Sequence, residues 1–363
     1  METTTPSEMD TEFTGSSLSI RIILTTIVTI TSFLTITGNI IIVYSYFTTR
    51  ALQTYTNYYI LNLAILDLIG GLFPMPMYGT YWILGYWPLS VPMCDFYLWV
   101  NHTTINATSF AVLIIAIDRY RSVVYPIQHF KQRNLKHALF WISTCIIIPL
   151  IIWTPTIFIW PAIGGRTFPP HICQPEYTNS LVFSAFAQLG LFWIPIITMA
   201  VLYAKVYRVY KKRIGTKNTK QREKKTQKEA SSSGVETAIS TNITTSRSEE
   251  GSSAAGTLEI DNQQSKKENK PEIESPRIKK ENRTAVRTLS FIFAVHLASG
   301  LPWGILVILF KMCPSCIPLA LYQTSVYAAR ISSLLNPVCY AAANTLYGDA
   351  FSRLLCYWKC RKS

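Results

Sequence analysis

Seven apolar blocks, each about as long as a helix that crosses a lipid bilayer, follow one another along the 363-residue chain. A helix needs ~20 predominantly apolar residues to span the hydrocarbon core. Lipid offers no hydrogen-bond partner to the backbone, so each block should be a helix that satisfies its own peptide groups. The sequence therefore predicts an all-α membrane protein, a seven-transmembrane helix bundle. The blocks are residues 22–47, 58–84, 95–117, 138–160, 181–207, 289–310 and 319–343.

The basic residues indicate the orientation of the chain. Lys and Arg cluster after the third, fifth and seventh blocks, and cytosolic loops carry such an excess. We therefore expect the N-terminus outside and the C-terminus in the cytosol of a plasma-membrane protein. The net charge of +14 favours anionic membrane lipids as partners, and no basic motif interleaved with aromatics supports nucleic acid.

The apolar blocks and the basic loops divide the chain into five expected segments. The long Lys-, Glu- and Ser-rich stretch has the composition of a disordered loop. The last segment begins with a short amphipathic run that should lie on the membrane surface. The segments are an extracellular tail (1–19), spans one to five (20–210), a disordered cytosolic loop (211–282), spans six and seven (283–342), and an amphipathic helix with a cytosolic tail (343–363).

Six of the eight cysteines lie where chemistry can act on them. Cys94 and Cys173 are both on the outer side, where an oxidising environment permits a disulfide. Cys313 and Cys316 could close a small ring, although a CxxC pair can also serve a redox or zinc site. The remaining two, which follow the amphipathic run, are candidates for palmitoylation: Cys356 and Cys360.

The third block contains a polar stretch, "DFYLWVNHTTINATSF", from Asp95 to Phe110. With a rise of ~1.5 Å per residue, Asn101 lies ~10 Å below the outer end of this helix. Its polar side chains should therefore face neighbouring helices or a cavity that opens outward.

Several short motifs together resemble the rhodopsin-like (class A) G-protein-coupled receptors. They are "IDRY" at the end of span three, "NPVCY" in span seven, Gly38–Asn39 in span one and Asp67 in span two. The stretches "GYWPL", "IWTP", "WPAIGGRT" and "CPSCIP" are further similar to muscarinic acetylcholine receptors. The resemblance implies a receptor that binds a small molecule and signals to a heterotrimeric G protein, without catalysing a reaction.

The resemblance also assigns roles to residues. Arg119 should pair with Asp118 in the resting receptor and help seat the G protein when span six moves. The coupling and switch residues would be Asp118, Arg119, Tyr120, Tyr203, Pro302, Pro337 and Tyr340. An allosteric Na⁺, the only cofactor expected, would bind among Asp67, Thr108, Ser332, Ser333 and Asn336. The alternative for Asp67 is a protonated, hydrogen-bonded core residue.

The ligand pocket departs from the muscarinic pattern. The Asp that pairs with the ammonium group of the ligand is here Asn101, and Arg330 replaces one tyrosine of the aromatic cage. These changes favour an anionic or neutral polar ligand. The expected pocket residues are Tyr97, Asn101, His102, Trp153, Ser184, Trp303, Val326 and Arg330.

Alternatives remain for this pocket. Arg330 could instead form an internal ion pair with Asp67, because charges inside membranes usually pair with one another. His102 could be a satisfied, neutral core residue. The chain could also be an orphan or constitutively active receptor, and a transporter is the rival class.

The switch region also departs from the family. Gly300 stands where relatives keep a Trp, and His296 where they keep a Phe. The acid that locks the span-three arginine from span six is here Asn282. Loss of that lock predicts raised basal signalling.

Overall fold

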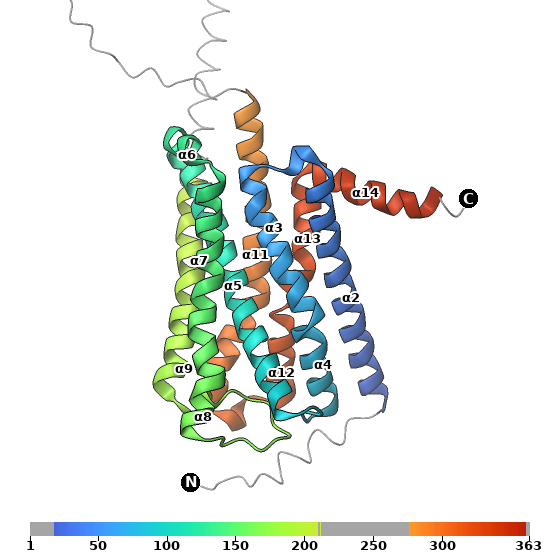
Figure 1. Ribbon diagram of the computed structural model, residues 1–363, viewed down its shortest axis with the longest axis vertical. Helices are drawn as coiled ribbons and strands as arrows, with labels where there is room; N and C mark the ends of the chain where they lie inside the picture. Colours follow the sequence, from blue (N-terminus) through green and yellow to red (C-terminus); the bar gives the residue numbers. More distant parts are fainter. Residues whose placement is uncertain (1–17, 210, 212–275, 361–363) are drawn as a thin grey trace, which may run out of the picture. The chain divides into compact units, whose positions relative to one another are not determined.

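The computed structural model describes residues 18–209, 211 and 276–360 (Figure 1). The chain divides into two units. The first, Met1–Tyr207 with Lys280–Ser363, holds the apolar helices. The second, Arg208–Lys279, lies almost wholly outside the described residues.

Six helical stretches of the described chain are long and apolar enough to cross a membrane. The first is a single helix, α2 (Leu18–Thr48). The second combines α3 (Tyr55–Leu72) with α4 (Pro74–Leu84), and the third is α5 (Val91–Val124). The short helix α6 (Pro126–Gln132) directly follows the C-terminal end of α5.

Spans four and five are each interrupted by a wider turn. Span four consists of α7 (Leu135–Thr154), the π-helical segment η2 (Pro155–Ile159) and α8 (Trp160–Gly164). Span five runs from Leu181 to Val209 and begins with α9 (Leu181–Gln188) and the π-helical segment η4 (Leu189–Trp193).

The seventh apolar block forms two helices instead of one. They are α12 (Leu319–Ala328) and α13 (Ile331–Ala343), separated by a break at Ala329 and Arg330. The sixth span belongs to α11 (Pro276–Met312), which contains Pro302 without ending there. The expected seven-helix, all-α bundle is thus confirmed, and the described residues contain no strand.

The chain end is helical as expected, in α14 (Thr345–Cys360). In Figure 1 this helix runs across the direction of α13. The side chains of the proposed palmitoylation sites, Cys356 and Cys360, lie outside the described ones. Helix α11 begins inside the segment expected to be a disordered loop (211–282), whose residues 212–275 are outside the description.

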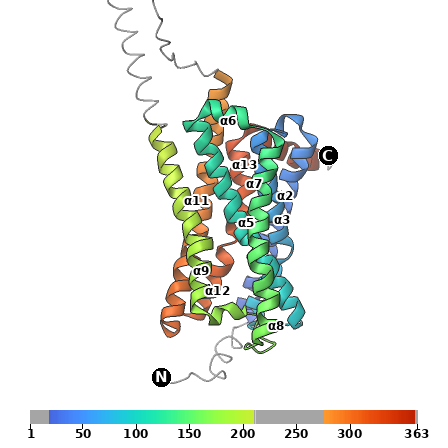
Figure 2. The same cartoon turned by 60° about the vertical axis from the view of Figure 1, so that its left-hand side comes forward.

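Helix α5 forms the centre of the bundle. Buried residues make up 72% of its apolar window, against 17–56% in the other spans. It contacts α3, α4, α7 and η4, an arrangement that can be followed in Figures 1 and 2. Its polar stretch therefore faces protein, while large side chains such as Phe33, Ile151 and Ile197 stay exposed on the outer surface, as lipid contact requires.

The buried apolar side chains form two clusters. The larger one joins the inner halves of the spans and includes Leu63, Val112 and Met199. The smaller one lies at the outer end, around the disulfide residues Cys94 and Cys173. Its aromatic members fix the outer loops against the helices: Tyr78, Trp82, Trp87, Tyr97 and Tyr327.

The first and second spans lie very close together at Gly79. A Cβ atom added there would collide with the side chain of Val28, which comes from α2. Small residues allow helix backbones to approach in this way inside membranes.

We expect Gly79→Ala to destabilise the receptor by about 1–3 kcal/mol, because Val28 must move to admit the methyl group. Gly70→Ala is the matched control, since a Cβ there meets no atom within 4 Å. Thermal unfolding of the two purified variants measures the difference. Equal melting temperatures would show that the close approach is absent.

Candidate functional site

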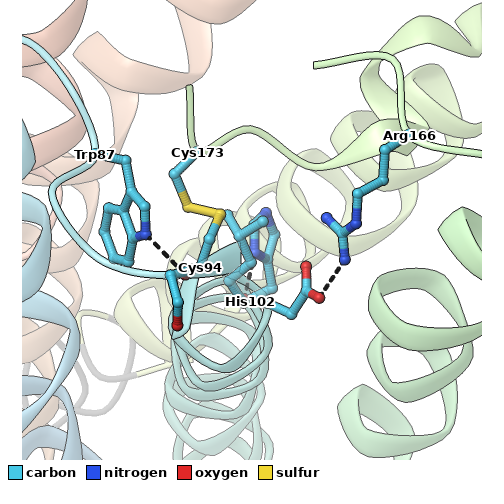
Figure 3. The surroundings of a disulfide bond; sticks show 8 residues. Trp87, Cys94, His102, Arg166 and Cys173 are labelled. Atoms are coloured by element: carbon cyan, nitrogen blue, oxygen red, sulfur yellow. Dashed lines mark hydrogen bonds and ion pairs between the residues drawn. A yellow bond between two sulfur atoms is a disulfide. The ribbon is translucent and has the colours of Figure 1, made fainter. Parts of the chain in front are cut away.

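A disulfide ties the outer loop to the start of span three. It joins Cys94 to Cys173, with 5.6 Å between their Cα atoms (Figure 3). Two contacts hold the loop beside it: the backbone N–H of Trp87 donates to the carbonyl of His171 at 2.7 Å, and Arg166 forms an ion pair with Asp95. The loop is thereby held over the outer end of α5.

The second outer pair, Cys313 and Cys316, also forms a disulfide. Their Cα atoms are 5.3 Å apart; Cys313 directly precedes the short turn Pro314–Cys316, and Cys316 ends it. The two cysteines thus close the small disulfide ring that was expected from the sequence. The other two cysteines that the structure describes, Cys145 and Cys339, are buried and free.

The clamped loop brings Tyr177 into contact with His102 of span three. The Tyr177 hydroxyl lies 3.1 Å from Nε2 of His102, and the Nδ1 atom lies 2.7 Å from the carbonyl oxygen of Leu98. A carbonyl only accepts, so Nδ1 carries a proton and Nε2 accepts from Tyr177. Burial raises the pKa of the Tyr177 hydroxyl, which keeps it a donor.

Aromatic rings enclose this hydrogen-bonded pair. The ring centroid of Trp153 lies 4.5 Å from that of His102 and 5.4 Å from that of Tyr177. Phe183 of α9 completes the cluster, 5.2 Å from Tyr177. This geometry fits the alternative that His102 is a satisfied core residue, and it places Trp153 in the wall of the outer half.

Arg330 lies in the break between α12 and α13 and is 5% exposed. Its Nε and Nη2 atoms have no hydrogen-bond partner among the described residues. The phenol groups of Tyr97, Tyr78 and Tyr327 lie in its neighbourhood. No ion pair joins it to Asp67 in the described part of the chain, so the internal ion pair considered as an alternative is not formed.

The other expected pocket residues come from four helices. Asn101 on α5 is buried, and its Oδ1 atom has no partner among the described residues. Tyr97, one turn above, is buried against Trp87, with ring centroids 5.3 Å apart. Val326 on α12 packs against the outer cluster. Neither Asn101 nor Tyr97 faces lipid.

Spans five and six are held together across the remaining part of the expected pocket. Lys311 of α11 donates to the hydroxyl of Ser184 at 2.6 Å and to the carbonyl of Thr178 at 3.0 Å. The Ser184 hydroxyl is therefore engaged within the protein. Deeper in, the ring of Phe192 packs edge-on against Trp303, with centroids 5.0 Å apart.

Gly304 makes this packing possible. A Cβ atom at Gly304 would clash with the ring of Phe192. The side-chain amide of Gln188 also donates to the carbonyl of Gly304 at 3.1 Å. The ring of Phe192 thus fills the space that a larger side chain at position 304 would take.

A small cavity of about 40 Å³ lies in the middle of the bundle. That volume admits one or a few water-sized groups. It is polar on several sides, and three of the residues expected to bind sodium line it. Its lining includes Thr104, Thr108, His296, Arg330, Ser332 and Ser333.

Asp67 is held beside this cavity. It is 1% exposed, and its two carboxylate oxygens accept from Ser333 Oγ and Asn336 Nδ2, each at 2.7 Å. The Oδ1 atom of Asn336 is buried without a described partner. Carboxylate, hydroxyl and amide oxygens are the ligands that hard cations prefer, so this donor set fits Na⁺.

At the inner end, Asp118 and Arg119 form the expected ion pair. Arg119 is 1% exposed and also donates to the hydroxyl of Thr56 at 2.5 Å. The other oxygen of Asp118 accepts from His129 Nε2 at 2.7 Å. Since Arg133 donates to Nδ1 of that ring, Nε2 must carry the proton.

The remaining switch residues surround this pair. Tyr340 is fully buried, and its hydroxyl has no partner among the described residues. Tyr203 bonds to Ser290, and Lys205 lies 5.9 Å from the centre of the Tyr120 ring. Pro302 and Pro337 lie inside α11 and α13, as sequence reasoning expected.

Sequence reasoning missed four residues that shape these regions. Tyr177 and Lys311 come from loop and helix-end positions that carry no motif, and Phe192 is one of 17 phenylalanines. His129 could have been suspected, because it is a histidine close after "IDRY" in a basic loop.

Comparison with known proteins agrees with this geometry. Residues 38–340 match the family "7 transmembrane receptor (rhodopsin family)". The muscarinic acetylcholine receptor M2 of Gallus gallus is 25% identical, over 90% of this chain and 91% of its own length. The M1 receptor of Sus scrofa is also 25% identical, over 91% and 88%.

A shorter match reaches higher identity. The muscarinic acetylcholine receptor M5 of Saimiri boliviensis boliviensis is 35% identical over 51% of this chain and 35% of its own length. Because the family match covers most of the chain, including every helix of the bundle in whole or part, the chain belongs to the rhodopsin family of seven-transmembrane, G-protein-coupled receptors, which are signalling receptors and not enzymes.

Proposed function

We propose that this receptor lies in the plasma membrane with its N-terminus outside, and that the small molecule it binds is not a cationic amine. The observation that carries the second part is Arg330, a buried cation in the outer half with no acidic partner among the described residues. The first part is supported by the Lys and Arg excess of the loops on one side.

Electrostatics decides against an amine. Two unit charges 4 Å apart interact by about 4 kcal/mol at an effective dielectric constant of 20. That energy corresponds to about a thousandfold in affinity. With Asn101 in place of the acid, the attraction is lost, and Arg330 adds repulsion of the same order to any ammonium group nearby. An aromatic cage offers only about 0.5–2 kcal/mol of cation–π energy in return.

The inner half is consistent with coupling to a heterotrimeric G protein, the general function of the family. Arg119 is held by Asp118 and Thr56, and Asp118 by His129. Ligand binding in the outer half would act on α11, which Lys311 and Gln188 tie to span five and its loop. Movement of α11 would then uncover Arg119 for the G protein.

We also propose that Asp67, Thr108, Ser332, Ser333 and Asn336 hold a sodium ion. The supporting observations are the oxygen-rich cavity lining and the unpartnered buried Oδ1 of Asn336. Bound Na⁺ would supply a counter-charge to Asp67, whose described partners, Ser333 and Asn336, are neutral. Its attraction to the carboxylate would have to exceed the repulsion from Arg330, which lines the same cavity.

The first test is a change of ligand charge preference. Membranes carrying the native receptor should show no acetylcholine-driven GTPγS loading of G proteins. The double variant Asn101→Asp with Arg330→Tyr should gain it, because it restores the acid and one tyrosine of the cage. Each single variant is a control. A native receptor that responds to low acetylcholine would contradict the proposal.

The second test concerns basal signalling. Asn282 cannot lock Arg119 as an acid would, and Arg119 Nε and Nη1 have no partner among the described residues. The side chains of residues 276–289 are not described. GTPγS loading without ligand should exceed that of Arg119→Ala at equal surface expression. Output equal to that variant would refute the prediction.

The third test concerns sodium. Replacing KCl by NaCl should stabilise the purified receptor by about 1 kcal/mol at a few times the dissociation constant. Asp67→Asn should abolish this difference, because the carboxylate supplies the charge that binds the ion. Paired thermal melts in the two salts measure the effect. A sodium effect that persists in the variant would rule out the site.

A further inference from the structure

The two unpartnered nitrogens of Arg330 belong to one edge of its guanidinium group. They are Nε and Nη2. The N–H bonds of this edge are nearly parallel, and they form the fork with which arginine binds both oxygens of a carboxylate. A buried charged donor without an acceptor is costly. The structure thus leaves a complete two-point recognition element without a described partner in the outer half of the bundle.

The groups near Arg330 do not satisfy this edge. The hydroxyl of Tyr78 donates to the carbonyl of Gln323 at 3.3 Å, and that of Tyr327 lies 2.6 Å from Thr31 Oγ1. These phenols stay neutral hydrogen-bonding groups and cannot supply a counter-charge. Tyr97 is the third phenol in the neighbourhood of Arg330.

The acidic side chains with described contacts are engaged elsewhere. Asp67 accepts from Ser333 and Asn336, and Asp95 pairs with Arg166. Glu176 accepts from the backbone N–H groups of the loop at Thr167 and Phe168. Among the residues that the structure describes, no carboxylate pairs with Arg330.

Resting on the function proposed above, we propose that the ligand of this receptor is a small organic carboxylate, and that its two oxygens accept from the Nε–H and Nη2–H of Arg330. The carboxylate supplies the missing counter-charge and matches the fork in shape. A monatomic anion would supply the charge but would use the two parallel donors less well. The break between α12 and α13 places the arginine where the bound acid can act on span seven.

The test uses three probes with the same ring and different head groups. Phenylacetate carries a carboxylate, phenylacetamide a neutral amide and phenethylamine a cation. Thermal unfolding of the purified full-length receptor is measured with each, at the same ionic strength and the same sodium concentration. Only phenylacetate should raise the melting temperature, by about 2–5 °C at ten times its dissociation constant. Inorganic phosphate is a fourth arm, and a larger shift with it would overturn the carboxylate assignment.

Variants connect the effect to the arginine. Arg330→Gln should weaken phenylacetate binding about 10- to 100-fold, because two charge-assisted hydrogen bonds are lost. Arg330→Lys keeps the charge without the fork and should show a smaller loss. Arg353→Gln removes an exposed arginine of α14 and should leave the shift unchanged. If Arg330→Gln does not fold, the lysine variant and the acid–amide comparison on the native receptor still decide.

The outcomes separate the two proposals. Equal shifts with acid and amide, a shift that survives Arg330→Gln, or no shift with phenylacetate would each overturn the carboxylate assignment. Stabilisation by phenethylamine would overturn the exclusion of amines as well. If none of the probes stabilises the receptor, only the carboxylate assignment fails. The exclusion of cationic amines is then still tested independently by the GTPγS assays.

Discussion

An ionised side chain inside a membrane bundle must find its counter-charge or hydrogen bonds within the protein, because lipid supplies neither. Asp118 meets this requirement through Arg119 and His129. Asp67 meets part of it through Ser333 and Asn336. Arg330 does not, since one edge of its guanidinium has no acceptor in the described chain. The inner half of the receptor thus contains a paired charge, at Asp118, and the outer half a charge with an unpaired edge, at Arg330.

Several of the other side chains expected in the outer pocket are engaged within the protein. Tyr177, brought in by the Cys94–Cys173 disulfide, bonds to His102 and packs on Trp153. Opposite this cluster, the ring of Phe192 takes the space above Gly304. These contacts use side chains that a muscarinic-like pocket would offer to a ligand. Among the expected pocket residues, Arg330, Asn101 and Trp153 keep buried polar atoms without a described partner, and only Arg330 carries a charge.

Much of this fold could be predicted from the sequence, because the length of an apolar block and the placement of basic loops follow directly from the bilayer. The Asp118–Arg119 pair and the outer disulfide were likewise accessible through short motifs. The break at Ala329 and Arg330 was not, since apolar residues flank it on both sides and both halves read as one span. Helical continuity is decided there by tertiary contacts, which hydropathy does not report.

The candidate site was less predictable, because it too depends on tertiary contacts between distant segments. Its residues were named, but their partners come from distant segments. His102 bonds to a tyrosine 75 positions away, and Ser184 to a lysine 127 positions away. Whether a polar residue is offered to a ligand or used internally depends on such contacts. The sequence therefore indicated the altered charge of the pocket, while the structure distinguished Arg330 from His102 and Ser184.

The most direct test of this account is a double-mutant cycle between Asp67→Asn and Arg330→Gln, read out by thermal unfolding of the ligand-free receptor. If Arg330 does not pair with Asp67, the coupling between the two substitutions should stay below about 1 kcal/mol, the small value expected of two residues that share only a cavity and Ser333. A coupling of about 2 kcal/mol or more would mean that the two charges pair with each other, and it would contradict the assignment of Arg330 to the ligand.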